Sequence, residues 1–213
     1  MKKALILFLV ALFTPVVTNA AVFTLDQTNL SVLTGGPWAT VTLTDTSSGG
    51  HDGVHFVVDP LESAFTSTGA NFGLQTFYFN ENTSFGSQLT LANFNPIGWS
   101  WNYSSPGSKN AGGGFGKFEF ITSGSGSTRA NPLSFDVFAP LGRSLTIENL
   151  STALSTEGYL FAGHIADFNG GQSAKFATDG QPPAPVPEPG TMILLGSGLM
   201  GLAGYGRRRR FLK

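Results

Sequence analysis

The sequence predicts an all-β fold, an antiparallel β-sandwich or jelly roll over residues 21–180, flanked by an N-terminal signal helix and a C-terminal transmembrane helix. Three observations carry this prediction. Apolar and polar residues alternate with period two through the middle of the chain, as they do in half-buried strands. Glycine, asparagine, serine and proline separate these stretches, and no middle segment has a long helical period. About nine short strands spaced in this way are typical of a sandwich.

Composition and charge limit the classes of protein to which the chain can belong. The chain has 213 residues, of which 41% are hydrophobic and 19 are phenylalanine, enough for one domain with a core. Between Asp26 and Asp179 five basic residues stand against twelve acidic ones, a formal charge of −7. Such an acidic domain lacks the basic face that binds nucleic acid. The chain has no cysteine, which excludes disulfides, thiolate metal sites and a cysteine nucleophile.

Residues 1–20 have the parts of a secretory signal peptide. Two lysines supply the positive charge, residues 4–13 form an apolar stretch too short to span a bilayer, and Pro15 ends the helix. Small residues then precede a cleavage site between Ala20 and Ala21. We therefore expect export through the Sec translocon and removal of this segment by signal peptidase.

The strands of the middle domain follow in order. Residues 39–44 alternate so that Val41 and Leu43 face one side, and residues 54–58 repeat the pattern. Residues 46–53 between them end in Asp-Gly and predict a hairpin turn. The other predicted strands are 74–79, 88–91, 98–103, 116–122, 133–138, 144–150 and 158–168.

An aromatic row is the first candidate site. Trp99, Trp101 and Tyr103 alternate with polar residues, so on one strand the three rings share a face. An exposed face of rings would stack on sugars, whereas a buried one would form part of a sandwich core. The core interpretation is favoured, and a carbohydrate-binding platform is the alternative.

Polar residues offer weaker candidates. His51, Asp52 and His55 are groups that suit zinc, but a structural site needs four ligands, and the pattern favours a turn with a solvent-facing histidine. His164 and Asp167 could join a nucleophilic triad, but the nucleophile elbow Gly-x-Ser-x-Gly is absent. Residues 167–172 could bend around calcium but favour a plain turn. We therefore expect no metal, no cofactor and no enzymatic activity.

The C-terminal part has three segments. Residues 181–189 are rich in proline and predict an extended, stiff linker. Residues 190–206 are uncharged and largely apolar, a length at the lower limit for a transmembrane helix. The basic tail 207–213 follows and would stay on the cytoplasmic side of the membrane; its membrane-stop residues are Arg207, Arg208, Arg209 and Arg210.

This tail resembles a known sorting signal. A Pro-Glu-Pro motif, a short apolar helix containing glycine and an arginine cluster together resemble the PEP-CTERM sorting signal of Gram-negative bacteria, over residues 185–213. Gly190 stands where serine or threonine is commoner. The same tail is also described as an ice-binding protein C-terminal domain, a name that implies no ice binding here. The motif residues are Val186, Pro187, Glu188 and Pro189.

The resemblance implies how the chain is processed. A membrane-embedded exosortase would recognise the motif and remove the helix, so Pro187, Glu188 and Pro189 are a substrate sequence. The precursor would be held transiently in the inner membrane of a Gram-negative bacterium and then reach the cell surface or extracellular matrix, for example in a biofilm. The alternative function for the middle domain is a module that binds exopolysaccharide.

Overall fold

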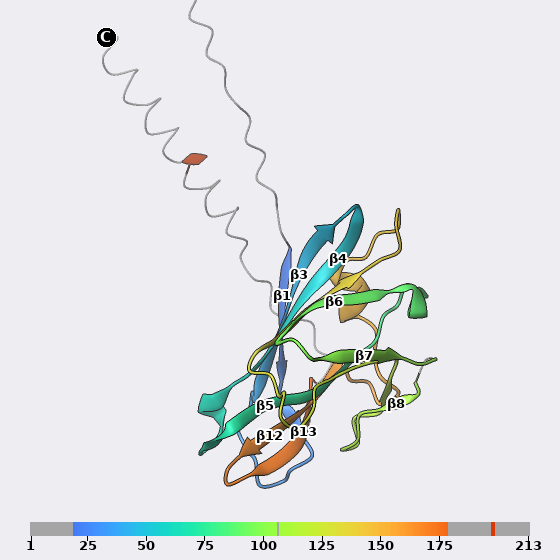
Figure 1. The fold of residues 1–213 in the computed structure, drawn as a ribbon. Coiled ribbons are helices and arrows are strands. Elements are labelled where there is room, and N and C mark those ends of the chain that lie inside the picture. Colours follow the sequence, from blue (N-terminus) through green and yellow to red (C-terminus); the bar gives the residue numbers. More distant parts are fainter. Residues whose placement is uncertain (1–18, 106, 179–196, 199–213) are drawn as a thin grey trace, which may run out of the picture. The chain divides into compact units, whose positions relative to one another are not determined.

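The computed structural model describes residues 19–105, 107–178 and 197–198. The strands of this part all lie within one compact unit, Asn19–Val186. They form two large antiparallel sheets and one small two-stranded sheet, with the large sheets as two layers (Figure 1). The predicted all-β antiparallel fold is confirmed.

The first sheet has five strands. Their spatial order is β1 (Ala20–Leu25), β3 (Ala39–Ser48), β4 (His51–Pro60), β11 (Leu133–Phe138) and β6 (Thr90–Asn95). Alternate residues of β3 are fully buried, as the sequence pattern predicts. The opposite face of β3 carries threonines and is partly exposed.

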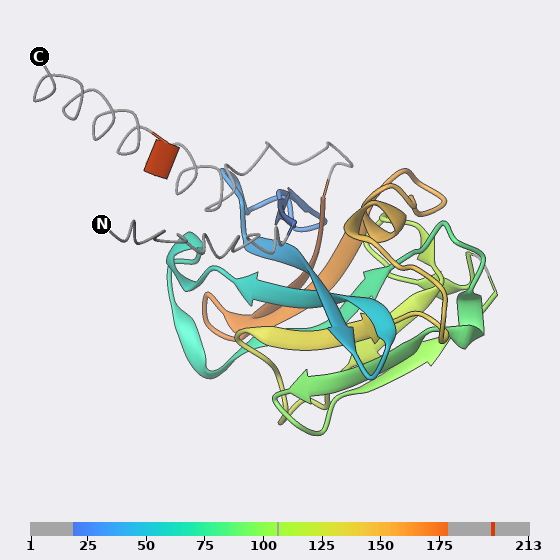
Figure 2. The same ribbon diagram turned by 90° about the horizontal axis from the view of Figure 1, so that it is seen from above.

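The second sheet has six strands. Their order is β2 (Gln27–Thr28), β13 (Gln172–Ala177), β12 (Phe161–Phe168), β5 (Thr68–Phe79), β10 (Phe120–Ser123) and β7 (Ser100–Tyr103). The small sheet pairs β8 (Lys109–Asn110) with β9 (Lys117–Phe118). Seen from above, the strands of the two large sheets lie in separate layers (Figure 2).

Phenylalanine rings fill the space between the two sheets. Phe56 of the first sheet stacks on Phe135 with ring centres 4.8 Å apart. It also meets Phe79 at 5.2 Å and Phe77 at 6.1 Å, both on β5 of the second sheet. Rings at these separations add to the stability that area burial gives. Phenylalanine side chains thus form much of the sandwich core.

The outer face of the six-stranded sheet is partly covered. A second buried cluster joins Tyr78 of β5 and Ala162 of β12 to Phe115 and Phe118. The last two belong to residues 110–118, which we call the covering segment. The outward-facing row that contains Tyr78 and Ala162 is therefore buried. The next outward-facing row along the same strands is not covered by this cluster.

The hairpin between β3 and β4 is tighter than predicted. Ser48 pairs directly with His51, so the turn has only two residues, Gly49 and Gly50. Both have positive φ, +58° and +81°. Two such residues form the turn that matches the right-handed twist of a hairpin. Asp52 and Gly53, which the sequence placed in the turn, belong to β4.

Other strand predictions differ in detail. Residues 144–150 were predicted as a strand, and this is wrong: they contain the start of helix α1 (Ile147–Ser151). The Asn149 side-chain oxygen accepts hydrogen bonds from the Thr146 N–H and hydroxyl, 2.9 Å each, which fixes the helix start. Segment 116–122 is divided between β9 and β10, and 88–91 begins in the 3₁₀ turn η2 (Gly86–Gln88). A second such turn, η1, is Glu62–Ala64.

The predictions for the two ends fall largely outside the described residues. The signal helix, the motif at 186–189 and the arginines at 207–210 lie outside them, as does the predicted transmembrane helix except for helical Ser197 and Gly198. Within the described ranges, no helix has both the length and the apolar character that a membrane crossing requires. Ala20 and Ala21 are described and lie in β1.

Candidate functional sites

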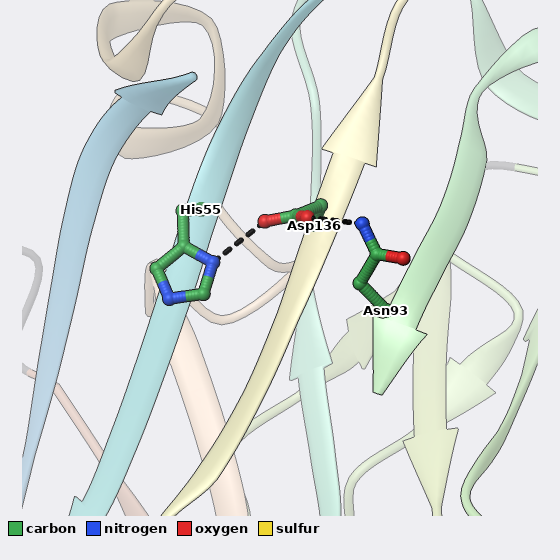
Figure 3. A network of polar contacts seen from close by, with 3 residues as sticks. All are labelled: His55, Asn93 and Asp136. Atoms are coloured by element: carbon green, nitrogen blue, oxygen red, sulfur yellow. Dashed lines mark hydrogen bonds and ion pairs between the residues drawn. The ribbon is translucent and has the colours of Figure 1, made fainter. Parts of the chain in front are cut away.

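The outer face of the five-stranded sheet carries a polar network centred on Asp136. His55 on β4 is the cross-strand neighbour of Asp136 on β11, and its Nδ1 lies 2.6 Å from Asp136 Oδ1. The amide of Asn93 on β6 donates to Asp136 Oδ2 at 2.6 Å (Figure 3). An ionised carboxylate only accepts hydrogen bonds, so His55 Nδ1 carries the hydrogen. The carboxylate is thus held from both sides, across three strands.

A bulge places Asn93 in this network. The pairing of β11 with β6 shifts between Ser134 and Asp136, and Asn93 has a φ of +56°. Asparagine tolerates this left-handed conformation better than most residues. The bulge turns the amide toward the neighbouring strand, an effect typical of bulges that re-aim a side chain.

The network has two parts of a catalytic triad. A carboxylate that fixes the tautomer of a histidine is how such triads orient a base. The His55 side chain is 39% exposed, but no hydroxyl in the described part of the chain forms a hydrogen bond with it. Its cross-strand neighbour on β3 is Thr44. The arrangement can bind three strands together and can present an oriented imidazole.

A cleft beside the end of β5 is the second candidate. Two adjoining hollows of about 410 and 260 Å³ share Glu81, Asn82 and Glu119 in their walls. Glu81 is only 7% exposed, and its carboxylate accepts from Gly86 N–H at 2.9 Å and from the N–H and hydroxyl of Thr83. Tyr103 lines the smaller hollow. The cleft can therefore receive polar ligands beside one aromatic ring.

The electrostatics of the cleft are set by its two carboxyl groups. Burial raises the pKa of Glu119; the hydrogen bond from Glu81 N–H to its carboxylate opposes this, and the charge of Glu81 adds to it. Asn80 fixes the backbone here, because its side-chain oxygen accepts from Glu119 N–H at 2.7 Å. A carboxyl of raised pKa, such as that of Glu119, can serve a proton transfer. Within the described ranges, however, no three histidine or acidic side chains gather closely enough to hold a metal ion.

The structure separates the three predicted aromatic residues by burial. Trp99 precedes β7, is 7% exposed and donates from Nε1 to the Thr128 carbonyl at 2.8 Å. Trp101 and Tyr103 pair with Thr122 and Phe120, which face the core. Both rings are half-buried at the edge of the sandwich and pack against the core. The three rings therefore do not form one exposed platform, and Tyr103 alone reaches the cleft.

The other predicted polar groups that form side-chain hydrogen bonds have separate partners. His51 is bonded through Nδ1 to the Ala139 carbonyl at 2.8 Å, whereas His55 is bonded to Asp136. The Asp167 carboxylate accepts a hydrogen bond from Asn71 N–H on β5 at 2.9 Å. His164 lies on β12 next to Ile165, whose side chain faces the core. The His164 side chain therefore lies on the outer face of the sheet. In the described part of the chain, His51, Asp52 and His55 do not form a metal-binding group, and no hydrogen bond joins His164 to Asp167.

Several residues of these sites were not identified from the sequence. Asp136 lies at a polar position of the predicted strand 133–138, so alternation places it on the outer face. Its meeting with His55 depends on the register of strands 81 residues apart, which alternation does not specify. Glu81 and Glu119 flank strand ends, and only the pairing of β5 with β10 brings them together.

The C-terminal tail is the part of the chain that matches a known family model. The family model of the PEP-CTERM protein-sorting motif matches residues 185–210, as the resemblance in the sequence implied. No curated protein and no solved structure matches the chain. The motif supports export followed by exosortase-dependent sorting, with exosortase as the processing partner. The chain is a protein that carries a PEP-CTERM protein-sorting motif and is thereby directed to the cell surface or the extracellular space.

Proposed function

We propose that the chain is a non-enzymatic surface or extracellular-matrix protein whose β-sandwich is the mature product. The observation that carries this is the sorting motif at residues 185–210. The precursor passes the inner membrane of a Gram-negative cell through the Sec translocon and loses its signal peptide. It is then anchored by the segment 190–206 until exosortase cuts beside the motif, and the released domain joins the matrix of a biofilm.

The polar sites of the domain support a non-catalytic role. Both oxygens of Glu81 are engaged by the backbone of residues 83–86, a structural use of a carboxylate. His55 is oriented, but the described residues supply no hydrogen-bonded hydroxyl as a nucleophile. A structural reading of both sites explains their hydrogen bonds without a reaction.

Processing is tested by deletion and mass. Removing residues 186–189 is expected to leave the full-length form in the membrane, because exosortase then lacks its recognition sequence. The intact mass of the wild-type protein from the surface and the medium is expected to correspond to a chain from Ala21 to the region 187–189. Normal maturation of the deletion variant, or a wild-type mass that runs on to Lys213, would refute this processing.

A second function, binding of exopolysaccharide, is favoured by one observation. The Tyr103 ring lines the cleft with Glu81 and Glu119, a mixture of ring and hydrogen-bonding groups that suits a sugar. Tryptophan fluorescence of the full chain is expected to change on titration with the exopolysaccharide, and Tyr103→Ala to abolish that change. Asn102→Ala, on the opposite face of the same strand, is the matched control. Equal responses from both variants would exclude the cleft as the binding site.

A further inference from the structure

A row of polar side chains crosses the outer face of the six-stranded sheet. Strand register places Ser100, Ser123, Thr76, His164 and Lys175 next to one another on β7, β10, β5, β12 and β13. They share the outer face, because the residues that follow the last three, Phe77, Ile165 and Phe176, are fully buried in the core. Five strands thus present one continuous row.

Two basic residues lie along this row, Lys175 at its β13 end and Arg129 on the β10 side of β5. Lys175 is the cross-strand neighbour of His164, and its ammonium lies 5.9 Å from the Tyr78 ring centre. Arg129 approaches from the loop after β10 and donates through Nη1 to the Asn71 carbonyl at 3.1 Å. In the described part of the chain, neither Lys175 nor Arg129 forms an ion pair. The nearby carboxylate of Asp167 is bonded to Asn71 N–H.

The charges of Lys175 and Arg129 affect the pKa of His164. The pKa of His164 is lowered to about 4, first by burial and then by the charges of Lys175 and Arg129. Burial also lowers the pKa of Lys175. An acidic domain that gathers two of its five basic residues around a histidine holds a local positive field that a bound anion would relieve.

Two polar atoms beside the basic groups lack partners. Thr76 Oγ1 and Arg129 Nε are buried, and neither has a hydrogen-bond partner. Most buried polar atoms are hydrogen-bonded, and an unpaired donor of a charged group is especially unfavourable. Thr76 Oγ1 lies next to His164 in the row, and an unpaired hydroxyl and an unpaired guanidinium N–H are groups that can hold an oxyanion.

The covering segment holds Lys175 in place. It buries the neighbouring row of the sheet, and Gly112 and Gly113 pass directly beside the Lys175 side chain. A Cβ on Gly113 would come within 3.0 Å of Lys175 Cβ, so only glycine allows this approach at its φ of +66°. The lysine stem is confined between loop and sheet, which reduces the entropy lost when its ammonium binds a ligand.

We propose that Arg129, His164, Lys175 and Thr76 form a binding site for an oxyanion, the carboxylate of a uronic acid or a sulfate or phosphate ester group. Arg129 supplies a planar donor pair, Lys175 a point charge, Thr76 a hydroxyl and His164 a ring N–H. The serines at the far end of the row extend the site with hydroxyl groups that suit the rest of a hydroxylated ligand. The site involves only the β-sandwich and does not depend on the sorting tail.

The experiment titrates the full chain, purified in a non-ionic detergent, with sulfate, phosphate and glucuronate in turn. Chloride keeps the ionic strength constant, and the His164 ring is followed by NMR, with His164→Gln identifying its signals. A saturable shift is expected with at least one oxyanion, together with an upward move of the His164 pKa, because a bound anion stabilises the protonated ring. The anion that binds identifies the chemical class, and glucose is the uncharged counterpart of glucuronate.

Matched variants decide whether the proposed residues hold the anion. Arg129→Gln or Lys175→Gln is expected to weaken binding about tenfold or more, since each removes a charge-assisted hydrogen bond. Lys175→Arg keeps the charge and should bind, and Arg143→Gln, a base that lies over Phe85 elsewhere, should bind like wild type. The proposal is overturned if no oxyanion gives a saturable shift, if glucose binds as well as glucuronate, or if Arg143→Gln weakens binding equally.

Discussion

Individual titratable groups decide how this domain responds to pH. His164 has a pKa of about 4 in the folded chain, below the 6.5 of a free histidine, because it is buried beside Lys175 and Arg129. The unfolded chain therefore binds more protons than the folded one between these two values. The contribution of His164 to stability is fully present above pH 6.5 and is lost as the pH falls through about 4.

The His164 side chain is expected to cause this loss of stability at low pH. His164→Gln should flatten the fall in the free energy of unfolding between pH 6.5 and 4, measured by urea denaturation at several pH values. Glu119 acts in the opposite sense, because its raised pKa favours the folded state at low pH and its contribution is lost as the pH rises. Glu119→Gln should therefore steepen the fall, and a flatter curve with Glu119→Gln would contradict the assignment.

Among the elements, the β3–β4 hairpin depends most on backbone conformation. Gly49 has a φ of +58°, and a Cβ placed there would meet no atom within 4 Å. An added Cβ thus meets no other residue, and the main cost of a substitution comes from the left-handed conformation. Gly49→Val is expected to lower the free energy of unfolding by about 1–2 kcal/mol, and Gly49→Asn by much less, because asparagine tolerates this region. Thermal unfolding measures both, and equal losses would disprove the backbone explanation.

The elements also differ in how well the sequence predicts them. Residues 133–138 alternate cleanly and form β11 with the predicted bounds. Residues 144–150 alternate too, but the hydrogen bonds between Thr146 and Asn149 begin a helix, a local signal that outweighs the period. β13 was missed because it follows directly on the glycine turn at 170–171. The pattern shows which face a residue takes, but not its neighbour across the sheet, so the Lys175–His164 row was not predictable.

The molecule as a whole is held by one aromatic core shared between its two sheets. Phe56 meets rings from both sheets, so Phe56→Ala is expected to destabilise the domain by about 3–5 kcal/mol. Val57→Ala, on the outer face of the same strand, should cost less than about 1.5 kcal/mol. Circular dichroism and tryptophan fluorescence are expected to give one unfolding midpoint, because Trp38 and Trp99 both belong to this core. Two separate midpoints would show that the sheets unfold independently.

The position of β1 has a consequence for the order of events during export. Its first residue, Ala20, pairs with Thr44, and Ala21 pairs with Leu43, while Asp45 N–H is bonded to the Asn19 carbonyl at 3.3 Å. The predicted signal-peptidase cut thus falls on a bond whose two flanking residues are both paired with β3 in the uncut chain. A protease needs that stretch of backbone free, so the cut has to come before β1 docks on β3. On the predicted cut, cleavage therefore comes before the start of β1 pairs with β3, the last strand pairing at that edge of the first sheet.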